Sequence, residues 1–199
     1  MKLYETFPDR ITVDGQEFRL TLYFDRVLRF LSLLEDKSCT AEEVTEAGFS
    51  WLVDCRRNIP IDMQNRVLQR VVADIITPKR RRLNSRRPQQ KCVDYDFDAA
   101  EIYASFWQAY GMDLVRQQGK LHWCAFQALF DGLPDDTPIR RIMRIRTEEI
   151  PPLTRSNAKQ IQSLTELKTL YRLPDTGGNS DSGAGWDGLF NMMLAKAKE

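Results

Sequence analysis

The sequence is poor in the residues from which catalytic and metal sites are usually built. It has one histidine, His122, and four cysteines among 199 residues. No two cysteines are separated by only two residues, so a structural zinc site has almost nothing to be built from. A glycine-rich phosphate loop, a G-x-S-x-G elbow and an H-E-x-x-H motif are also absent. We therefore expect a protein that is not an enzyme and has no cofactor.

Long hydrophobic runs are missing as well. No apolar stretch approaches the roughly 18–20 residues that span a bilayer. The first ten residues carry acids and lack the apolar segment of a signal peptide. These observations predict a cytoplasmic protein whose cysteines stay reduced, and we expect three of the four in core-facing positions.

The chain has no excess of charge of either sign. Lys and Arg total 29 against 28 for Asp and Glu, which gives a formal net charge of +1. A dedicated nucleic-acid binder draws most of its affinity from neutralising phosphates, so this balance argues against that class. The apolar fraction of 42% and the charged fraction of 29% are those of an ordinary globular protein. A chain of this length can bury a core without disulfides or metals.

The pattern of apolar residues predicts a mainly α fold with a small N-terminal β-hairpin. Apolar and polar side chains alternate over residues 11–13 and again over residues 18–22. Between them, Asp14 and Gly15 supply a turn with positive φ angles, which suits a tight hairpin. We therefore expect two antiparallel strands at the start of the chain.

Two helices are predicted directly after the hairpin. Asp25 is the expected N-cap of the first, because apolar residues at helical spacing follow it. Thr40 and Glu43 have the spacing of a capping box at the start of the second. We extend this second helix to Cys55, although Gly48 in its interior weakens the pattern.

Three further helices are predicted from proline and capping signals. One has Pro60 in its first turn and runs to Ile76. Another begins with Thr137 and Pro138 and ends before a pair of prolines. Thr154 is the expected N-cap of the last helix of the body.

Two helices in the middle of the chain are predicted from aromatic residues. The first ends at Gly111, a plausible C-cap, and carries one aromatic stripe. The members of this stripe are Ala100, Tyr103, Trp107 and Tyr110. In the second, HWCAFQALF is apolar almost all round, which indicates a helix buried on most sides.

Residues 78–91 differ from the rest of the body. They hold seven basic residues, no acids and two prolines, so we predict a mobile loop. The loop could contact nucleic acid electrostatically, but it lacks interleaved aromatics that would stack on bases. The interpretation we favour is a solvated loop, which could pair with the acids of residues 94–101. The candidate nucleic-acid residues are Arg80, Arg81, Arg82, Arg86 and Arg87.

The end of the chain predicts a tethered helix. Residues 174–185 have the composition of a flexible linker after a body at 1–173. Residues 186–199 place apolar side chains on one face of a short amphipathic helix. We hypothesise that this face binds a partner, and the alternative is that it folds back onto its own domain. The residues of the face are Trp186, Leu189, Phe190 and Met193.

Three acids resemble the first half of a calcium-binding loop. Asp94, Asp96 and Asp98 have the required alternation. The rest of the loop fails, because position six is Ala99 instead of glycine and position twelve is Ser105 instead of glutamate. We expect these acids to lie at the start of a helix, where the helix dipole favours negative charge.

His122 and Cys124 could suggest a thiol nucleophile and its base. Side chains two positions apart on a helix point about 200° apart, so these two cannot pair. A pair formed with one of the other cysteines would depend on a tertiary contact that the sequence does not reveal. We expect His122 to be a hydrogen-bonded histidine of the core.

Three segments, taken together, resemble a known family. They are ITVDGQEFRLTLYFDRVL, DFDAAEIYASFWQAYGMDL and GKLHWCAFQALFDGLPDDTPIRRIMRIR. Their order and motifs are similar to those of the phage family labelled gp-fifteen, over most of residues 1–150. The most specific part is the H-W-x-x-F-x-A-L block.

The resemblance implies a function in phage tail assembly. Members of that family are encoded near the tape-measure gene in tailed phages and prophages of Gram-positive bacteria. They resemble tail assembly chaperones, which keep the tape-measure protein soluble and help to recruit tail-tube subunits. The implied location is the cytoplasm of the infected or lysogenic host.

The resemblance brings no cofactor and no catalytic residue, and it implies that His122, Trp123 and Phe126 belong to the core. Two alternatives stay open beside a chaperone. One is a minor structural protein of the virion tail, and the other is a nucleic-acid-binding module that uses the basic loop. Self-association of the chain also stays open.

Overall fold

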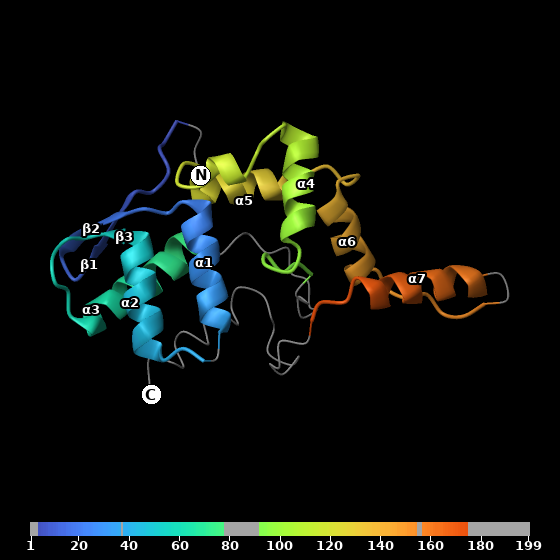
Figure 1. Cartoon of the computed structure of the whole chain (residues 1–199), viewed down its shortest axis with the longest axis horizontal. Helices are drawn as coiled ribbons and strands as arrows, with labels where there is room; N and C mark the ends of the chain where they lie inside the picture. The colour runs from blue at the N-terminus through green and yellow to red at the C-terminus, as the bar shows by residue number, and fades with distance from the viewer. Residues whose placement is uncertain (1–3, 37, 78–91, 155–156, 175–199) are drawn as a thin grey trace. The chain divides into compact units, whose positions relative to one another are not determined.

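The computed structural model describes residues 4–36, 38–77, 92–154 and 157–174 (Figure 1). Within these residues it has seven α-helices and a three-stranded antiparallel sheet, which confirms the mainly helical fold with a small N-terminal hairpin. They fall into two compact units. One holds the described parts of Met1–Gln89 and Val115–Asp131, and the other holds those of Gln90–Leu114 and Gly132–Asp181.

The sheet belongs to the first unit and contains the predicted hairpin. Its strands, in the order β1-β2-β3, are β1 (Arg10–Val13), β2 (Gln16–Leu20) and β3 (Val53–Asp54). Asp14 and Gly15 connect β1 to β2 with φ angles of 49° and 77°. Positive φ at both turn residues matches the right-handed twist of the flanking strands. This two-residue turn sets the register, in which Val13 pairs with Gln16.

The prediction that the second helix reaches Cys55 is wrong. The helix ends at Leu52, and Val53 takes an extended conformation with φ −122° and ψ 124°. Val53 then pairs with Leu20 as part of β3. The helical spacing of apolar residues continues through this point in the sequence. The backbone of Val53 nevertheless pairs with β2 and does not continue the hydrogen bonds of the helix.

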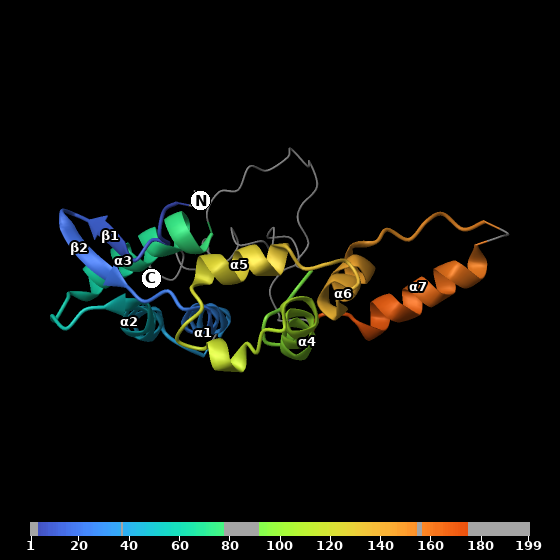
Figure 2. The ribbon, with the colours of Figure 1, turned by 90° about the horizontal axis from the view of Figure 1, so that it is seen from above.

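The first unit surrounds its sheet with four helices and two short helical turns. Their bounds are α1 (Phe24–Glu35), α2 (Ala41–Leu52), α3 (Ile61–Val71), η1 (Val72–Ile76), η2 (Val115–Gln117) and α5 (Trp123–Asp131). Figure 2 looks along α1 and α2 and shows them side by side. The helix predicted to open around Asn58, with Pro60 in its first turn, begins later, at Ile61, with Pro60 as its N-cap residue. It ends at Ile76 as predicted, and its last turn, η1, is a π-helix.

The predicted N-cap residue is confirmed for α2 and is wrong for α1. At α2, Glu43 N donates to the Thr40 hydroxyl and Thr40 N donates to the Glu43 carboxylate at 2.8 Å, a complete capping box. Asp25 is not the N-cap of α1, because the N-cap residue is Tyr23, two positions earlier, and Asp25 lies in the first turn of the helix. Asp25 instead accepts a hydrogen bond from Gly119 N at 2.9 Å.

α5 packs into the core of the first unit through one face. The prediction that it is buried on most sides is wrong, because only three of its nine residues are buried. Trp123 and Phe126 have no exposed surface. The indole N–H of Trp123 donates to the Ile76 carbonyl at 3.3 Å, and its backbone N–H donates to the Leu22 carbonyl at 2.7 Å. Phe126 stacks on Phe24 with ring centroids 5.1 Å apart. One helix thus joins η1, the chain after β2 and α1.

Gly48 is explained by close packing inside α2. A Cβ placed on Gly48 would lie 2.7 Å from Cδ2 of Phe30 and 3.2 Å from Cδ1 of Leu68. Phe30 and Leu68 are themselves fully buried. Only glycine lets α2 approach α1 and α3 this closely, although glycine lowers the helix propensity by about 1 kcal/mol relative to alanine.

In the second unit the helices are α4 (Ala99–Tyr110), α6 (Pro138–Thr147) and α7 (Ala158–Leu170). Gly111 ends α4 with a φ of 60°, which confirms the predicted C-cap. Pro138 opens α6, also as predicted. α7 does not have Thr154 as its N-cap: Asn157 occupies that place, and its side-chain oxygen accepts from Thr154 N at 2.7 Å.

The core of the second unit lies between α4 and α6. Ile102 and Phe106 of α4 and Ile139 and Ile142 of α6 are buried. Ser105, which is fully buried, accepts a hydrogen bond from Ile139 N at 3.0 Å. This bond satisfies a donor at the first turn of α6, where the helix itself offers no acceptor.

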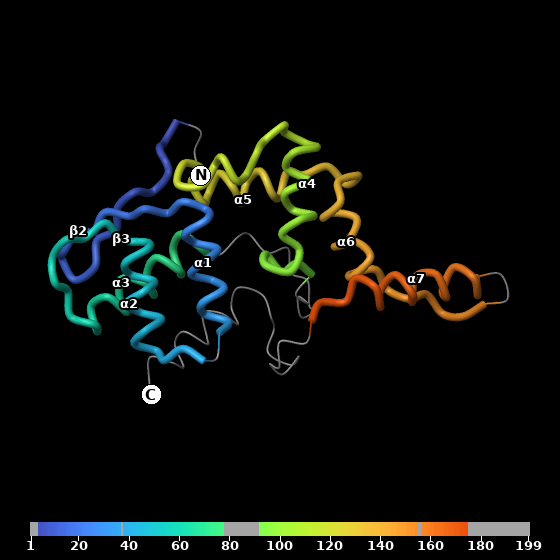
Figure 3. The backbone as a smooth tube through the Cα atoms, in the orientation of Figure 1, coloured from blue at the N-terminus to red at the C-terminus, as the bar shows by residue number. Residues whose placement is uncertain are grey.

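A buried ion pair connects the start of α4 to the end of α6 in this unit. Arg146 forms two hydrogen bonds with the Asp98 carboxylate, at 2.6 and 2.7 Å, and the side chains are 8% and 2% exposed. The same guanidinium donates to the carbonyl of Tyr171 at 2.6 Å and to that of Cys92 at 3.0 Å. Figure 3 traces the segments that meet here, which include the start of α4 and the ends of α6 and α7.

In the part of the chain that the structure describes, the helices are too short or too polar to cross a membrane. The longest of them, α7, has only 13 residues. A helix needs about 20 apolar residues to span the hydrocarbon core.

We expect Gly48→Ala to destabilise the first unit, because the added methyl group would overlap the ring of Phe30. Overpacking of this kind costs about 1–3 kcal/mol. The measurement is the midpoint of urea unfolding. Ser50→Ala, an exposed position on the same helix, is the control and should change stability by less than about 0.5 kcal/mol. Equal stability of the two variants would show that α2 and α1 are not this close.

We expect Asp98→Asn to lower the free energy of unfolding by about 3–5 kcal/mol, because it leaves the Arg146 guanidinium buried without a counter-charge. Arg10→Ala is the control, since Arg10 and Glu17 pair at 3.2 Å with side chains 60% and 59% exposed. An exposed pair contributes less than about 1 kcal/mol. If Asp98→Asn lowers the free energy of unfolding no more than Arg10→Ala does, the buried pair does not contribute the stability expected of it.

Candidate functional site

Two sets of predicted site residues lie outside the described residues. One is the partner-binding face, Trp186, Leu189, Phe190 and Met193, and the other is the basic set, Arg80, Arg81, Arg82, Arg86 and Arg87. Both sets stay predictions from the sequence. The geometry below concerns the described residues.

His122 caps a helix and does not face a nucleophile. It immediately precedes α5, and its Nδ1 accepts a hydrogen bond from Cys124 N at 3.1 Å. A side-chain acceptor of this kind satisfies one of the free N–H groups of a helix start. The backbone of His122 also forms an isolated β-bridge with Tyr23. The expected hydrogen-bonded histidine is present, half-buried, and the ring nitrogen that could act as a base is occupied.

The environment of His122 favours its neutral form. Its ring stacks on Phe7, with centroids 4.9 Å apart and planes 4° from parallel. Burial lowers the pKa of His122 from 6.5, and the backbone of Pro8 and the charge of Asp9 oppose this shift. Nε2 is buried and forms no hydrogen bond of acceptable geometry, so a proton added to this ring would be poorly solvated.

None of the four cysteines forms a disulfide and each is half-buried, so the expectation that three of them face the core is wrong. Cys124 and Cys92 lie on partly covered surfaces, where burial raises the pKa of each thiol. A raised pKa leaves little thiolate at neutral pH. Among the described residues, no group of three or more His, Cys, Asp or Glu side chains could hold a metal ion.

The three acids before α4 have two different structural roles. Asp94 accepts hydrogen bonds from Asp96 N at 3.0 Å and from Phe97 N at 2.9 Å, which shapes the turn into the helix. Asp98 points inward to Arg146 and also accepts from Asp94 N at 2.9 Å. The expectation that these acids lie at the start of a helix is confirmed, since Asp98 is the N-cap residue of α4, but its buried ion pair was not predicted. No sequence motif marks its partner, 48 positions away.

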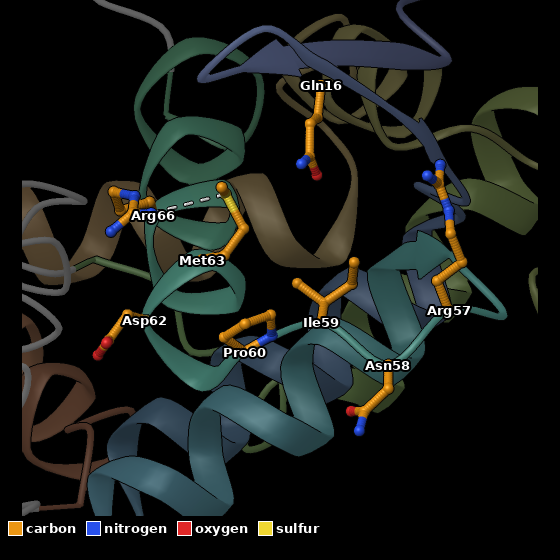
Figure 4. Close-up of a pocket in the computed structure, with 8 residues that line it drawn as sticks. All are labelled: Gln16, Arg57, Asn58, Ile59, Pro60, Asp62, Met63 and Arg66. Carbon is orange, nitrogen blue, oxygen red and sulfur yellow. Dashed lines mark hydrogen bonds between the residues drawn. The ribbon is translucent and has the colours of Figure 1, made fainter.

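A shallow depression lies on the first unit, between the hairpin, the chain before α3 and α3 itself (Figure 4). Its volume is about 430 Å³, and its lining has no histidine, cysteine or hydroxyl side chain. The lining residues are Gln16, Arg57, Asn58, Ile59, Pro60, Asp62, Met63 and Arg66. Arg66 already pairs with Asp14 at 2.9 Å, so half of the positive charge near the depression is neutralised.

The predicted aromatic stripe of α4 faces away from the core. We call Ala100, Tyr103, Trp107 and Tyr110 the aromatic face. Trp107 is 54% exposed and Tyr110 is 37% exposed, whereas Ile102 and Phe106 supply the buried side of the helix. Tyr103 and Trp107 stack with centroids 6.4 Å apart. The helix was predicted correctly, and its aromatic face is a surface that a partner could cover.

A comparison with protein families gives one match. The family described as Bacteriophage Gp15 protein matches residues 3–173, which includes the described parts of both units. No curated protein and no solved structure matches the chain.

We expect the stability of the protein to fall as the pH drops below about 6.5, because burial disfavours the charged form of His122 in the folded state. Its folded pKa is lower than its unfolded pKa, so the unfolded chain takes up more protons in this range. The stabilisation is complete above the unfolded pKa and is lost as the pH falls through the folded pKa. Urea midpoints between pH 8 and pH 5 measure it.

His122→Asn separates titration from capping, since asparagine keeps an acceptor at the helix start and does not titrate. The variant should lose the dependence of stability on pH between about 6.5 and 5. If its pH profile has the same slope as that of the natural chain, another group is responsible.

Proposed function

The chain belongs to the bacteriophage Gp15 protein family, and from this premise we propose that it is a non-enzymatic protein resembling a tail assembly chaperone. Family membership points to a phage structural or tail-related protein. The finer proposal is that the chain binds the tape-measure protein, tail-tube subunits or both during tail morphogenesis. Its partners are unfolded or partly assembled phage proteins that expose apolar helices.

The observation that carries the proposal is exposed apolar surface on the second unit. Besides the aromatic face of α4, Leu167 and Leu170 of α7 are 36% and 70% exposed. α7 buries only Leu164 among its apolar residues. Apolar side chains exposed together on a surface are typical of sites that bind other proteins. A protein that binds other chains needs such surfaces, whereas an enzyme would use a concave site with converging polar groups.

The polar side chains of the described residues support the same interpretation. His122 caps a helix, and Asp98 and Arg146 neutralise each other within a core. The one depression described above lacks a nucleophile and base in contact. These three side chains are thus used for structure, which favours binding over catalysis as the proposed activity.

The terminal face of Trp186, Leu189, Phe190 and Met193 remains part of the proposal. Residues 174–185 have a linker composition, and a short amphipathic helix on a linker can bind an apolar partner weakly and reversibly. Reversible binding suits a protein that holds the tape-measure chain and then releases it.

We expect the tape-measure protein of the same phage to stay soluble and to co-purify when it is co-expressed with this chain. Trp186→Ala should weaken co-purification about tenfold or more, because aromatic anchors dominate small interfaces. Asn191→Ala, on the polar side of the same predicted helix, is the matched control and should have little effect. The measurement is the soluble yield of the complex.

Different results would favour the alternatives. A chain that does not keep the tape-measure protein soluble but is found in purified virions would be a minor structural protein. A chain that shifts DNA or RNA in a gel in a strongly salt-dependent manner would favour the nucleic-acid interpretation of the basic residues.

A further inference from the structure

The outer edge of β1 carries backbone groups that no strand of the described chain meets. The sheet has the order β1-β2-β3, so β1 has a neighbouring strand on one side only. Leu20 N donates to the Asp9 carbonyl at 2.7 Å, and hydrogen-bonded pairs alternate along an antiparallel ladder. The backbone groups of residues 9, 11 and 13 therefore point toward β2, and those of Arg10 and Thr12 point away from it. Within the described residues, the N–H and C=O groups of Arg10 and Thr12 form no hydrogen bond.

This edge has few of the features that keep edge strands apart. The pairing of β1 with β2 runs from Arg10 to Val13 without a bulge, and these four residues include no proline and no lysine. Their one charge is that of Arg10, which lies with Thr12 on the exposed side of the sheet. Bulges, prolines and charges are the usual protection of an open edge. A single arginine repels most strands, but it favours one that places an acid opposite to it.

A second copy of the same strand offers that acid. When two β1 strands pair antiparallel about a two-fold axis at Thr12, Thr12 lies opposite Thr12 and Arg10 lies opposite Asp14. Ile11 then lies opposite Val13 on the other side of the sheet. Threonine pairs and pairs of opposite charge both stabilise adjacent strands. A two-fold axis at Ile11 would instead place Arg10 opposite Thr12, without an acid, so charge selects the axis at Thr12.

Both charged partners of this register are accessible. The Asp14 side chain is 55% exposed, and its Oδ2 accepts from Arg66 at 2.9 Å, which leaves Oδ1 as an acceptor. The Arg10 side chain is 60% exposed and contacts Glu17 through Nη1 at 3.2 Å. A guanidinium has five N–H donors, so Arg10 can bind a second carboxylate without leaving the first.

We propose that the chain forms a two-fold dimer by antiparallel pairing of β1 with β1 of a second copy, centred on Thr12. Thr12 of each copy donates to and accepts from Thr12 of the other, and the two sheets become one continuous sheet. A strand of four residues buries little area, so the dimer is weak and its population depends on concentration. The pairing needs no phage partner and therefore holds or fails independently of the proposed function.

Disulfide trapping in the full chain tests the register. Thr12→Cys should form a disulfide-linked dimer under mild oxidation, because Cα atoms of a hydrogen-bonded pair lie about 5.5 Å apart, within the span of a disulfide. Glu17→Cys is the matched control, since Glu17 is exposed on β2 directly opposite Thr12 but lies one strand away from the proposed axis. It should stay monomeric. The natural chain, with its four half-buried cysteines, gives the background of other disulfides.

Sedimentation equilibrium tests the charge pairing without a new thiol. Arg10→Glu should raise the dissociation constant of the dimer about tenfold or more, because two pairs of opposite charge become two pairs of like charge. Arg19→Glu changes the net charge equally at an exposed position of β2 and is the control. It should change the constant less than about twofold, since Arg19 does not face the second copy.

Four results would overturn the proposal. Thr12→Cys could form no more dimer than Glu17→Cys, or the natural chain could stay monomeric even at about 1 mM. Arg10→Glu and Arg19→Glu could weaken the dimer equally, in which case the contact is elsewhere. If the backbone N–H of Thr12 gains protection from hydrogen exchange only when the tape-measure protein is added, the strand that pairs with β1 belongs to that partner. Selective trapping of Thr12→Cys, together with selective weakening by Arg10→Glu, is the result expected for the dimer.

Discussion

The second unit depends on the bidentate ion pair between Asp98 and Arg146. The pair is nearly inaccessible to solvent, and the guanidinium also binds two backbone carbonyls, so most of its donors are satisfied. Removing two charges from water is costly unless the geometry is good and the remaining groups are paired. The arrangement meets both conditions. It joins the turn before α4, the end of α6 and the end of α7, which are far apart in the sequence.

This constraint also decides which surface the unit presents. Arg146 holds the N-terminal end of α4, and Ser105 is hydrogen-bonded to the first turn of α6. These two contacts fix which side of α4 faces the core. Ile102 and Phe106 then face inward, and Trp107 faces outward.

The first unit uses its most distinctive sequence for packing. His122 caps α5, while Trp123 and Phe126 fill the core against η1 and α1. The H-W-x-x-F block that carried the resemblance to the phage family is therefore a signature of the fold.

The sequence alone determined the features that depend on neighbouring residues. The Asp14-Gly15 turn, the capping box of Thr40 and Glu43, and the C-cap Gly111 follow from local geometry, so their residue types identify them. Strand β3, the close approach at Gly48 and the partner of Asp98 depended on residues brought together from distant segments. The division into two units carries no sequence signal, since residues 115–131 of one interrupt the other. Helical spacing predicted the aromatic stripe of α4, but only packing decided that it faces solvent, because a period of 3.6 residues does not say which side the partner helix occupies.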